Sequence, residues 1–200
     1  MSSSDRVVVV GGGVSGLACA HRLHKAGVPF TLLEAADAPG GRVRTDHYNG
    51  FLLDRGFQVL LTAYPEAGRL LNYKKLSLRK FRSGALIRWG GGFHRLVDPW
   101  RDPFKALPTL FSPIGTFRDK LKIAKLRSNV KSKSLFNIFN AEDQTTIAEL
   151  KSYQFSPEII NQFFRPFFGG VFLDRDLLTS SRMFNFVFQM FSRGHVTLPR

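Results

Sequence analysis

Four consecutive valines followed by three glycines are the feature that most constrains how this chain folds. Residues 6–10 are mostly β-branched and stop at the glycines, which predicts a buried parallel strand. Residues 16–26 predict a helix with one apolar face, and Gly27 stands where a helix commonly ends. Residues 30–33 predict a second buried strand. Strand, glycine turn, helix and strand in this order indicate a βαβ unit, and hence an α/β fold.

The glycines have the spacing Gly11-x-Gly13-x-x-Gly16, between the predicted strand and the predicted helix. In a dinucleotide-binding turn these glycines allow the tight turn, the close approach of a pyrophosphate, and close packing of helix on strand. The start of the helix then offers free N–H groups to the phosphates. Glu34 ends the second strand and is placed to accept hydrogen bonds from a ribose. Its charge argues against NADP, whereas NAD, FAD and a glycine turn without a ligand stay open at this point.

A second glycine pair follows in the segment Gly40-Gly41-Arg42-Val43-Arg44-Thr45. Together with the valine–glycine run and Glu34, this segment resembles the FAD-dependent amine oxidase superfamily, which includes phytoene-type carotenoid desaturases, protoporphyrinogen oxidases and monoamine oxidases. The resemblance implies that Gly41 brings backbone close to the diphosphate of FAD. It also implies that Arg42 reaches the ribityl–phosphate side of the cofactor, where a guanidinium suits phosphate oxygens.

The resemblance continues along the chain. Residues 50–57, with Asp54-Arg55-Gly56, resemble a family segment close to the flavin, and Phe57 stands where monoamine oxidases usually have a second glycine. Residues 163–172 resemble part of the substrate domain of the family. No catalytic residue is implied, because the hydride chemistry belongs to the cofactor. The cofactor-binding residues implied by motif and resemblance are Gly11, Gly13, Val14, Ser15, Gly16, Glu34, Ala35, Gly40, Gly41, Arg42 and Gly56.

The composition changes after the first third of the chain. We place a boundary near residue 75, between an FAD-binding part at 1–75 and a substrate-type part at 76–200. The first part is expected to be an incomplete Rossmann-like parallel sheet, and the second to be α-rich with a small β-meander. Elements are predicted at 64–72 (helix), 75–96 (short strands), and 103–111, 116–132, 145–153, 156–168 and 180–192 (helices).

Lysine and arginine outnumber aspartate and glutamate by 29 to 15, which gives a net charge of +14. Such a surplus favours phosphates, nucleic acids or anionic membranes as partners. We expect no nucleic-acid partner, because no nucleic-acid-binding motif is present. Residues 116–133 contain seven basic side chains and one acid. They predict either a solvated surface helix or a peripheral contact with anionic lipid.

A single cysteine, Cys19, excludes an intrachain disulfide and a cysteine zinc site, and it is expected to pack inside the first helix. His21 and His24 have no carboxylate cluster beside them, so we expect no metal. Six residues precede the valine run, too few for a signal or transit peptide. We therefore expect a cytoplasmic protein, or one of the plastid stroma, peripheral to a membrane.

The function expected from the resemblance is that of an FAD-dependent oxidoreductase, which removes a hydride from a hydrophobic small molecule such as a polyene, a porphyrinogen or an amine. The alternative is a non-catalytic FAD- or ADP-binding module, or an inactive truncated isoform. Two parallel strands are fewer than a doubly wound domain needs, so we expect an incomplete oxidase that is unstable or aggregation-prone alone, with weak or absent FAD binding and no turnover. The phenylalanine stripe at 184, 188 and 191 predicts either core or the wall of an apolar tunnel.

Overall fold

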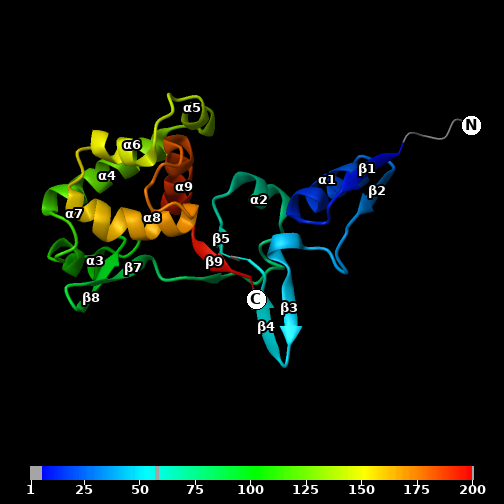
Figure 1. Ribbon diagram of the computed structural model, residues 1–200, viewed down its shortest axis with the longest axis horizontal. Helices are drawn as coiled ribbons and strands as arrows, with labels where there is room; N and C mark the ends of the chain where they lie inside the picture. Colours follow the sequence, from blue (N-terminus) through cyan, green and yellow to red (C-terminus); the bar gives the residue numbers. More distant parts are fainter. Residues whose placement is uncertain (1–5, 57–58, 200) are drawn as a thin grey trace, which may run out of the picture. The chain divides into compact units, whose positions relative to one another are not determined.

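The computed structural model describes residues 6–56 and 59–199, which form two compact units. Of the described residues, the first unit comprises 6–56, 59–60, 69–78 and 198–199. The second comprises Leu61–Gly68 and Arg79–Thr197. Figure 1 labels the elements. Helices and strands occur together, with one small parallel sheet, and this confirms the predicted α/β class.

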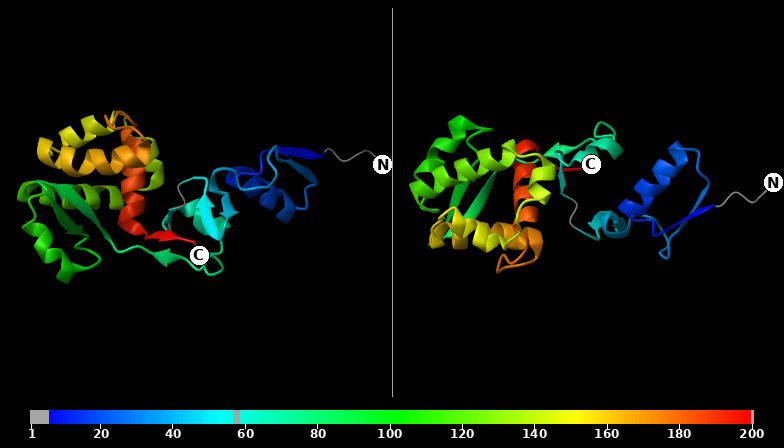
Figure 2. Two further views of the ribbon diagram at one scale, coloured as in Figure 1. Left: turned by 60° about the horizontal axis from the view of Figure 1, so that its bottom comes forward. Right: turned by 90° about the horizontal axis from the view of Figure 1, so that it is seen from above.

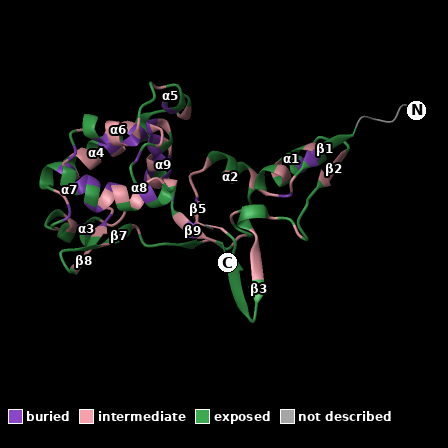
Figure 3. Cartoon of the chain, viewed as in Figure 1, coloured by how far each residue is buried: buried purple, intermediate pink, exposed green. Residues whose placement is uncertain are grey.

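The first unit begins with the predicted βαβ unit. Strand β1 (Val7–Val10), helix α1 (Val14–Lys25) and strand β2 (Phe30–Leu33) follow one another, and the two strands pair in parallel from Val7↔Phe30 to Val10↔Leu33. The pairing is confirmed, but the predicted burial is wrong: Val9 is buried, whereas Val10 is 81% exposed and Leu33 is 52% exposed. Side chains alternate between the two faces of a strand, so one face of this pair lies open to solvent. Figure 3 shows how little of this unit is buried.

A hairpin that the sequence analysis did not predict follows the second glycine pair. Strand β3 (Thr45–Tyr48) and strand β4 (Phe51–Asp54) pair antiparallel. The turn between them is Asn49-Gly50, with φ of 48° and 83°. Both residues are left-handed, as the tight turns that fit the twist of a hairpin require. A short 3₁₀ turn, η1 (Gly41–Val43), connects the glycine pair to this hairpin.

The second unit is mainly helical. Its hairpin of β7 (Gly84–Trp89) and β8 (Gly92–Val97) lies beside α3 (Pro103–Leu110) on one flank of the helices, as the views in Figure 2 show. The other helices are α4 (Phe117–Ser132), α5 (Leu135–Phe139), α6 (Thr146–Ser152), α7 (Pro157–Ile159), α8 (Arg165–Phe172) and α9 (Ser181–Arg193).

Several elements differ in detail from the prediction. The helix predicted at 156–168 runs on to residue 172 and contains a π-helical turn, η2 (Ile160–Phe164), between α7 and α8. The strands predicted as a meander form a hairpin, while β6 (Arg79–Lys80) joins β9 (Val196–Leu198) and β5 (Leu60–Leu61) in the order β5-β9-β6. The short helix predicted at 64–72 is α2 (Pro65–Leu70). Cys19 is exposed, so the prediction that it packs in the interior is wrong.

Side-chain caps begin most of the helices in the second unit. The capping residues of α3, α4, α5, α6, α7 and α9 are Asp102, Thr116, Ser134, Thr145, Ser156 and Ser180. Each side chain accepts a hydrogen bond from a backbone N–H of the first turn, and this stabilises the helix start. At α4, Thr116 and Asp119 cap each other's backbone N–H groups in a capping box.

An aromatic core holds the second unit together. Phe164, Phe168 and Phe184 have no more than 1% of their surface exposed, and the rings of Phe168 and Phe184 lie 4.8 Å apart, edge to face. Phe188 and Phe191 are partly buried against the same core. The core interpretation of the phenylalanine stripe is therefore confirmed for Phe184. Within the described part of the chain, no helix is both long and apolar enough to span a bilayer.

Candidate cofactor site

The glycine turn leaves the start of α1 open. Gly13 is the N-terminal cap residue of α1 and offers no side chain, so no side-chain cap occupies this helix start, in contrast to the capped helices of the second unit. The first intrahelical bond runs from the N–H of Leu17 to the carbonyl of Gly13. The N–H groups of Val14, Ser15 and Gly16 therefore have no helical partner, and Val14 and Ser15 are exposed. Such a helix start favours an anion.

The glycines of the turn have different surroundings. A Cβ atom on Gly16 would lie 1.8 Å from the carbonyl oxygen of Gly11, so the protein itself forbids a side chain there. A Cβ atom on Gly13 would meet nothing within 4 Å. Gly16 thus lets the helix pack on the turn, whereas the space beside Gly13 is free for a ligand. The predicted packing role of Gly16 agrees with this geometry, and the pyrophosphate contact at Gly13 stays a prediction.

Glu34 connects the end of β2 to the glycine turn. One of its carboxylate oxygens accepts a hydrogen bond from the N–H of Gly12, and the other accepts one from the N–H of Ala36 at 2.8 Å. The bonds from Ala36 and Gly12 lower the pKa of Glu34, which keeps it ionised at neutral pH. A Cβ on Gly12 would lie 2.9 Å from the Glu34 carboxylate. Gly12 was absent from the predicted site. The motif does not require a glycine at this position, so its presence between Gly11 and Gly13 was a signal that could have indicated the close contact with Glu34.

The glycine pair Gly40-Gly41 lies directly against the glycine turn of residues 11–13. The N–H of Gly40 donates to the carbonyl of Gly12 at 2.9 Å, and Gly13 and Gly40 form a parallel bridge. A Cβ on Gly41 would approach the Cα of Gly13 to 3.3 Å. Gly56 continues the cluster, because its Cβ would lie 2.3 Å from the carbonyl oxygen of Arg42. Three motifs separated in sequence therefore meet within the first unit; Phe57, which follows them, lies outside the described residues.

The arginines near the second glycine pair have different partners. Arg44 forms ion pairs with Asp37 and, at 3.1 Å, with Asp46, while Arg55 pairs with Asp46 at 2.6 Å. Hydrogen bonding and charge from Arg44 lower the pKa of Asp37 to about 2. In the part of the chain that the structure describes, Arg42 has no such partner and its side chain is exposed. Arg42 is therefore the arginine of this segment whose charge is available to an anion.

An apolar groove of about 380 Å³ lies in the second unit, between strand β7 and the η2–α8 segment. Ile87 lines it from the strand, and Phe163 and Phe167 line it from the helix, with their rings stacked 5.7 Å apart. Arg88 and Gln162 add polar groups to the wall. In this segment Phe163 and Phe167 thus line the groove, whereas the neighbouring Phe164 and Phe168 belong to the core.

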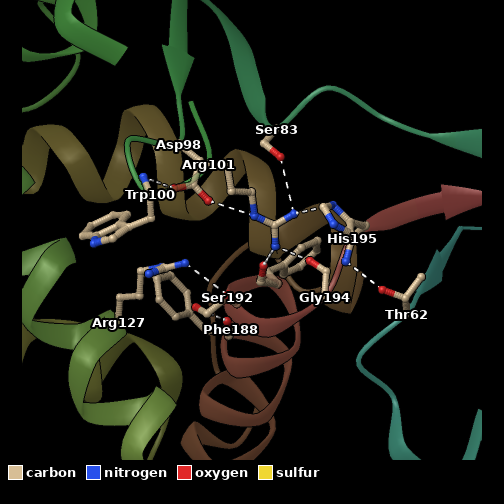
Figure 4. A network of polar contacts seen from close by, with 11 residues as sticks. Thr62, Ser83, Asp98, Trp100, Arg101, Arg127, Phe188, Ser192, Gly194 and His195 are labelled. Carbon is tan, nitrogen blue, oxygen red and sulfur yellow. Dashed lines mark hydrogen bonds and ion pairs between the residues drawn. The ribbon is translucent and has the colours of Figure 1, made fainter. Parts of the chain in front are cut away.

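Arg101 is the centre of a polar network at the C-terminal end of α9 (Figure 4). Its guanidinium donates to the carbonyls of Phe191, at 2.7 Å, and Gly194, and it lies 3.3 Å from the Asp98 carboxylate. It also contacts Nδ1 of His195 at 3.1 Å. A cation at a helix C-terminus satisfies unpaired carbonyls and opposes their negative charge. We interpret this network as structural, and a lone arginine in a loop gave no signal of it in the sequence.

Beside this network, Arg127 lies 4.3 Å above the ring of Trp100 and donates to the carbonyl of Ser192 at 3.1 Å. This second cation binds the same helix end, so α9 is fixed from two sides (Figure 4).

Comparison with known proteins places these motifs in a family context. A model of the family described as flavin containing amine oxidoreductase matches residues 14–200. The chloroplastic/mitochondrial protoporphyrinogen oxidase 2 of Arabidopsis thaliana is 30% identical over 168 residues, 84% of this chain and 32% of that protein. Phytoene desaturase (lycopene-forming) of Pseudescherichia vulneris is 49% identical over 55 residues, 28% of this chain and 11% of that protein.

The fold has relatives among solved structures as well. A crystal structure of an oxidoreductase from Methanosarcina mazei superimposes with a TM-score of 0.70 at 24% identity, and the match covers 98% of this chain and 46% of that one. The chain thus spans about a third of the length of the Arabidopsis protein and under half of the solved chain.

Proposed function

Since the chain belongs to the family of flavin-containing amine oxidoreductases, we propose that its first unit binds the adenosine diphosphate half of FAD, within a protein that oxidises a hydrophobic small molecule. Membership of this family confirms the predicted cofactor, FAD. The residues that bind it in this chain, the reaction and the substrate are parts of the proposal.

The contact between the two glycine segments carries the proposal. The bond from Gly40 to Gly12 and the approach of Gly41 to Gly13 create a side-chain-free backbone surface beside the uncapped start of α1. A diphosphate needs such a surface, because its oxygens accept hydrogen bonds from backbone N–H groups at close range. Arg42 supplies a positive charge at the same place.

Glu34 suits the ribose of the adenosine. Two of its lone pairs are used by Gly12 and Ala36, and an ionised carboxylate has about four acceptor positions in all. The remaining positions can accept from the ribose hydroxyls. The same carboxylate would repel a 2′-phosphate, so the site favours FAD over NADP.

When bound, the flavin would supply two-electron chemistry, as acceptor of a hydride from a C–H bond of the substrate, with oxygen or a quinone as the final oxidant. The chain's own contribution is to bind and orient. The apolar groove lined by Ile87, Phe163 and Phe167 supports a hydrophobic substrate. The relatives include a protoporphyrinogen oxidase, a polyamine oxidase and a phytoene desaturase, so it is the groove, and not their names, that supports an apolar substrate here.

The test measures the affinity for FAD of the native chain and of Gly13→Ala by calorimetry, with Gly170→Ala in α8 as the matched control. A Cβ is free of protein contacts at both positions, so neither variant clashes within the fold. We expect Gly13→Ala to weaken FAD binding about tenfold or more, because the methyl group occupies the space of the diphosphate. Equal affinities for all three proteins would contradict the proposed site.

Turnover separates the two candidate functions. Reduction of bound flavin by an added porphyrinogen or polyene would support an oxidoreductase. Stoichiometric flavin without reduction by any such compound would instead support the non-catalytic FAD- or ADP-binding module.

A further inference from the structure

Helix α3 presents apolar side chains to solvent along one face. Phe104 is 92% exposed, Leu107 is 63% exposed and Phe111, which caps the helix, is 85% exposed. Their spacing of three and then four residues places them on a single stripe of the helix. Single exposed apolar residues are ordinary, whereas two almost fully exposed phenylalanines on one short stripe indicate an interaction surface.

The opposite face of α3 fixes the direction of this stripe. Ala106 is buried, and the hydroxyl of Thr109 accepts a hydrogen bond from the N–H of Val97 at the end of β8. The helix is therefore attached to the second unit by one face, which leaves the stripe of Phe104, Leu107 and Phe111 pointing away from the protein.

The first turns of α4 extend the apolar surface. Phe117 is 59% exposed and Leu121 is 58% exposed. The ammonium group of Lys120 donates to the carbonyls of Leu110, at 2.9 Å, and Ser112, at 2.8 Å, so the start of α4 is tied to the end of α3. We call the residues Phe104, Leu107, Phe111, Phe117 and Leu121 the α3–α4 apolar surface.

The net charge around this surface is positive. Residues 102–133 contain two acids, Asp102 and Asp119. Asp102 caps α3 and pairs with Lys105 at 2.8 Å, and Asp119 is buried. Arg118 and Lys125 lie exposed on α4. The charge that reaches solvent from α3 and α4 is therefore positive.

We infer that the α3–α4 apolar surface docks the protein on an anionic lipid bilayer, with Phe104 and Phe111 inserted among the acyl chains and the basic residues at the headgroups. Exposed aromatic and leucine side chains beside lysine and arginine are what a helix at a membrane interface requires. The positive charge selects anionic lipid, and its attraction weakens with salt. In this proposal α3 inserts into the bilayer, and the basic residues of α4 contribute the attraction to the headgroups.

The test is co-sedimentation of the whole chain with vesicles of phosphatidylcholine, with or without phosphatidylglycerol, at low and high salt. The native chain is expected to bind the vesicles that contain phosphatidylglycerol and to bind more weakly at high salt. The double variant Phe104→Ser/Phe111→Ser should lose at least about tenfold in partitioning, since two large apolar side chains no longer enter the bilayer. Phe136→Ser is the matched control, because Phe136 is 75% exposed on α5, and it should bind like the native chain.

A second variant isolates the charge. Arg118→Gln/Lys125→Gln should bind anionic vesicles several-fold more weakly and with a smaller dependence on salt. Native-like binding by the double phenylalanine variant would overturn the role of α3 and leave a purely electrostatic contact. Absence of binding by the native chain would overturn the proposal. The proposal would also be overturned if the chain self-associated and the phenylalanine substitutions abolished this self-association but left vesicle binding unchanged. The surface would then bind a second copy of the chain.

Discussion

Gly16→Ala tests whether the packing of α1 on the glycine turn positions the cofactor site. The new Cβ would lie 1.8 Å from the carbonyl oxygen of Gly11, more than 1 Å short of the 3.0 Å that real Cβ atoms keep. The obstacle is backbone, so it cannot rotate away, and either α1 or the turn must move. Overpacking of this kind costs about 1–3 kcal/mol, while alanine in a helix gains about 1 kcal/mol over glycine. We expect a net destabilisation of α1 by up to about 2 kcal/mol.

Amide hydrogen exchange over α1 measures this local effect, with α9 of the second unit as internal reference. Protection of α1 should fall while that of α9 stays the same, and FAD affinity should fall with it, because the first N–H groups of the helix are displaced. Gly170→Ala, also in a helix but with open space around its Cβ, should raise local protection. Native protection and native FAD affinity in Gly16→Ala would refute the steric reasoning.

Two further predictions concern the second unit. Asp119 accepts hydrogen bonds from Thr116 and from the backbone and hydroxyl of Ser156. We therefore expect Asp119→Ala to lower the free energy of unfolding, measured in urea, by about 2–4 kcal/mol. A loss below about 0.5 kcal/mol would contradict that role. Burial and the charges of Lys80 and Arg101 lower the pKa of His195, so the unfolded state binds the proton more readily, and stability should fall as the pH drops below the ordinary value of 6.5. His195→Gln should flatten this part of the profile in thermal unfolding; an unchanged profile would show that other groups cause it.

Local motifs were the most predictable part of this structure. The βαβ unit, the starts of α3 and α4, and the positions of most helices follow from glycine placement, capping residues and apolar spacing. The hairpin β3–β4 was not predicted although Asn49-Gly50 is a strong turn signal, because the flanking residues 45–48 and 51–54 do not alternate between apolar and polar. The exposure of Val10 and Leu33 could not be predicted, since burial depends on which other segments cover a strand and not on its own residues.

The residues of the candidate site were partly predictable, because its local motifs are visible in the sequence and their contacts in space are not. The sequence indicated Gly13, Gly41 and Gly56 as separate motifs, and their contact in space is a tertiary fact. The engagement of Glu34 with Gly12 likewise depends on how the end of β2 meets the turn. Arg42 and Arg44 both follow the glycine pair in the sequence, and only the structure shows that Arg44 is paired with Asp37 and Asp46.

The π-helical turn η2 has a geometric consequence for the helix that follows it. Each residue of an α-helix advances the direction of its side chain by about 100°, and a π turn accommodates one residue more than an α turn does. Regular α-helical winding of residues 160–164, with no residue removed, would rotate α8 by about that angle. Phe167 would then turn away from the groove and Phe168 away from the core. The winding of this one turn therefore decides which aromatic rings face the groove and which pack in the core of the second unit.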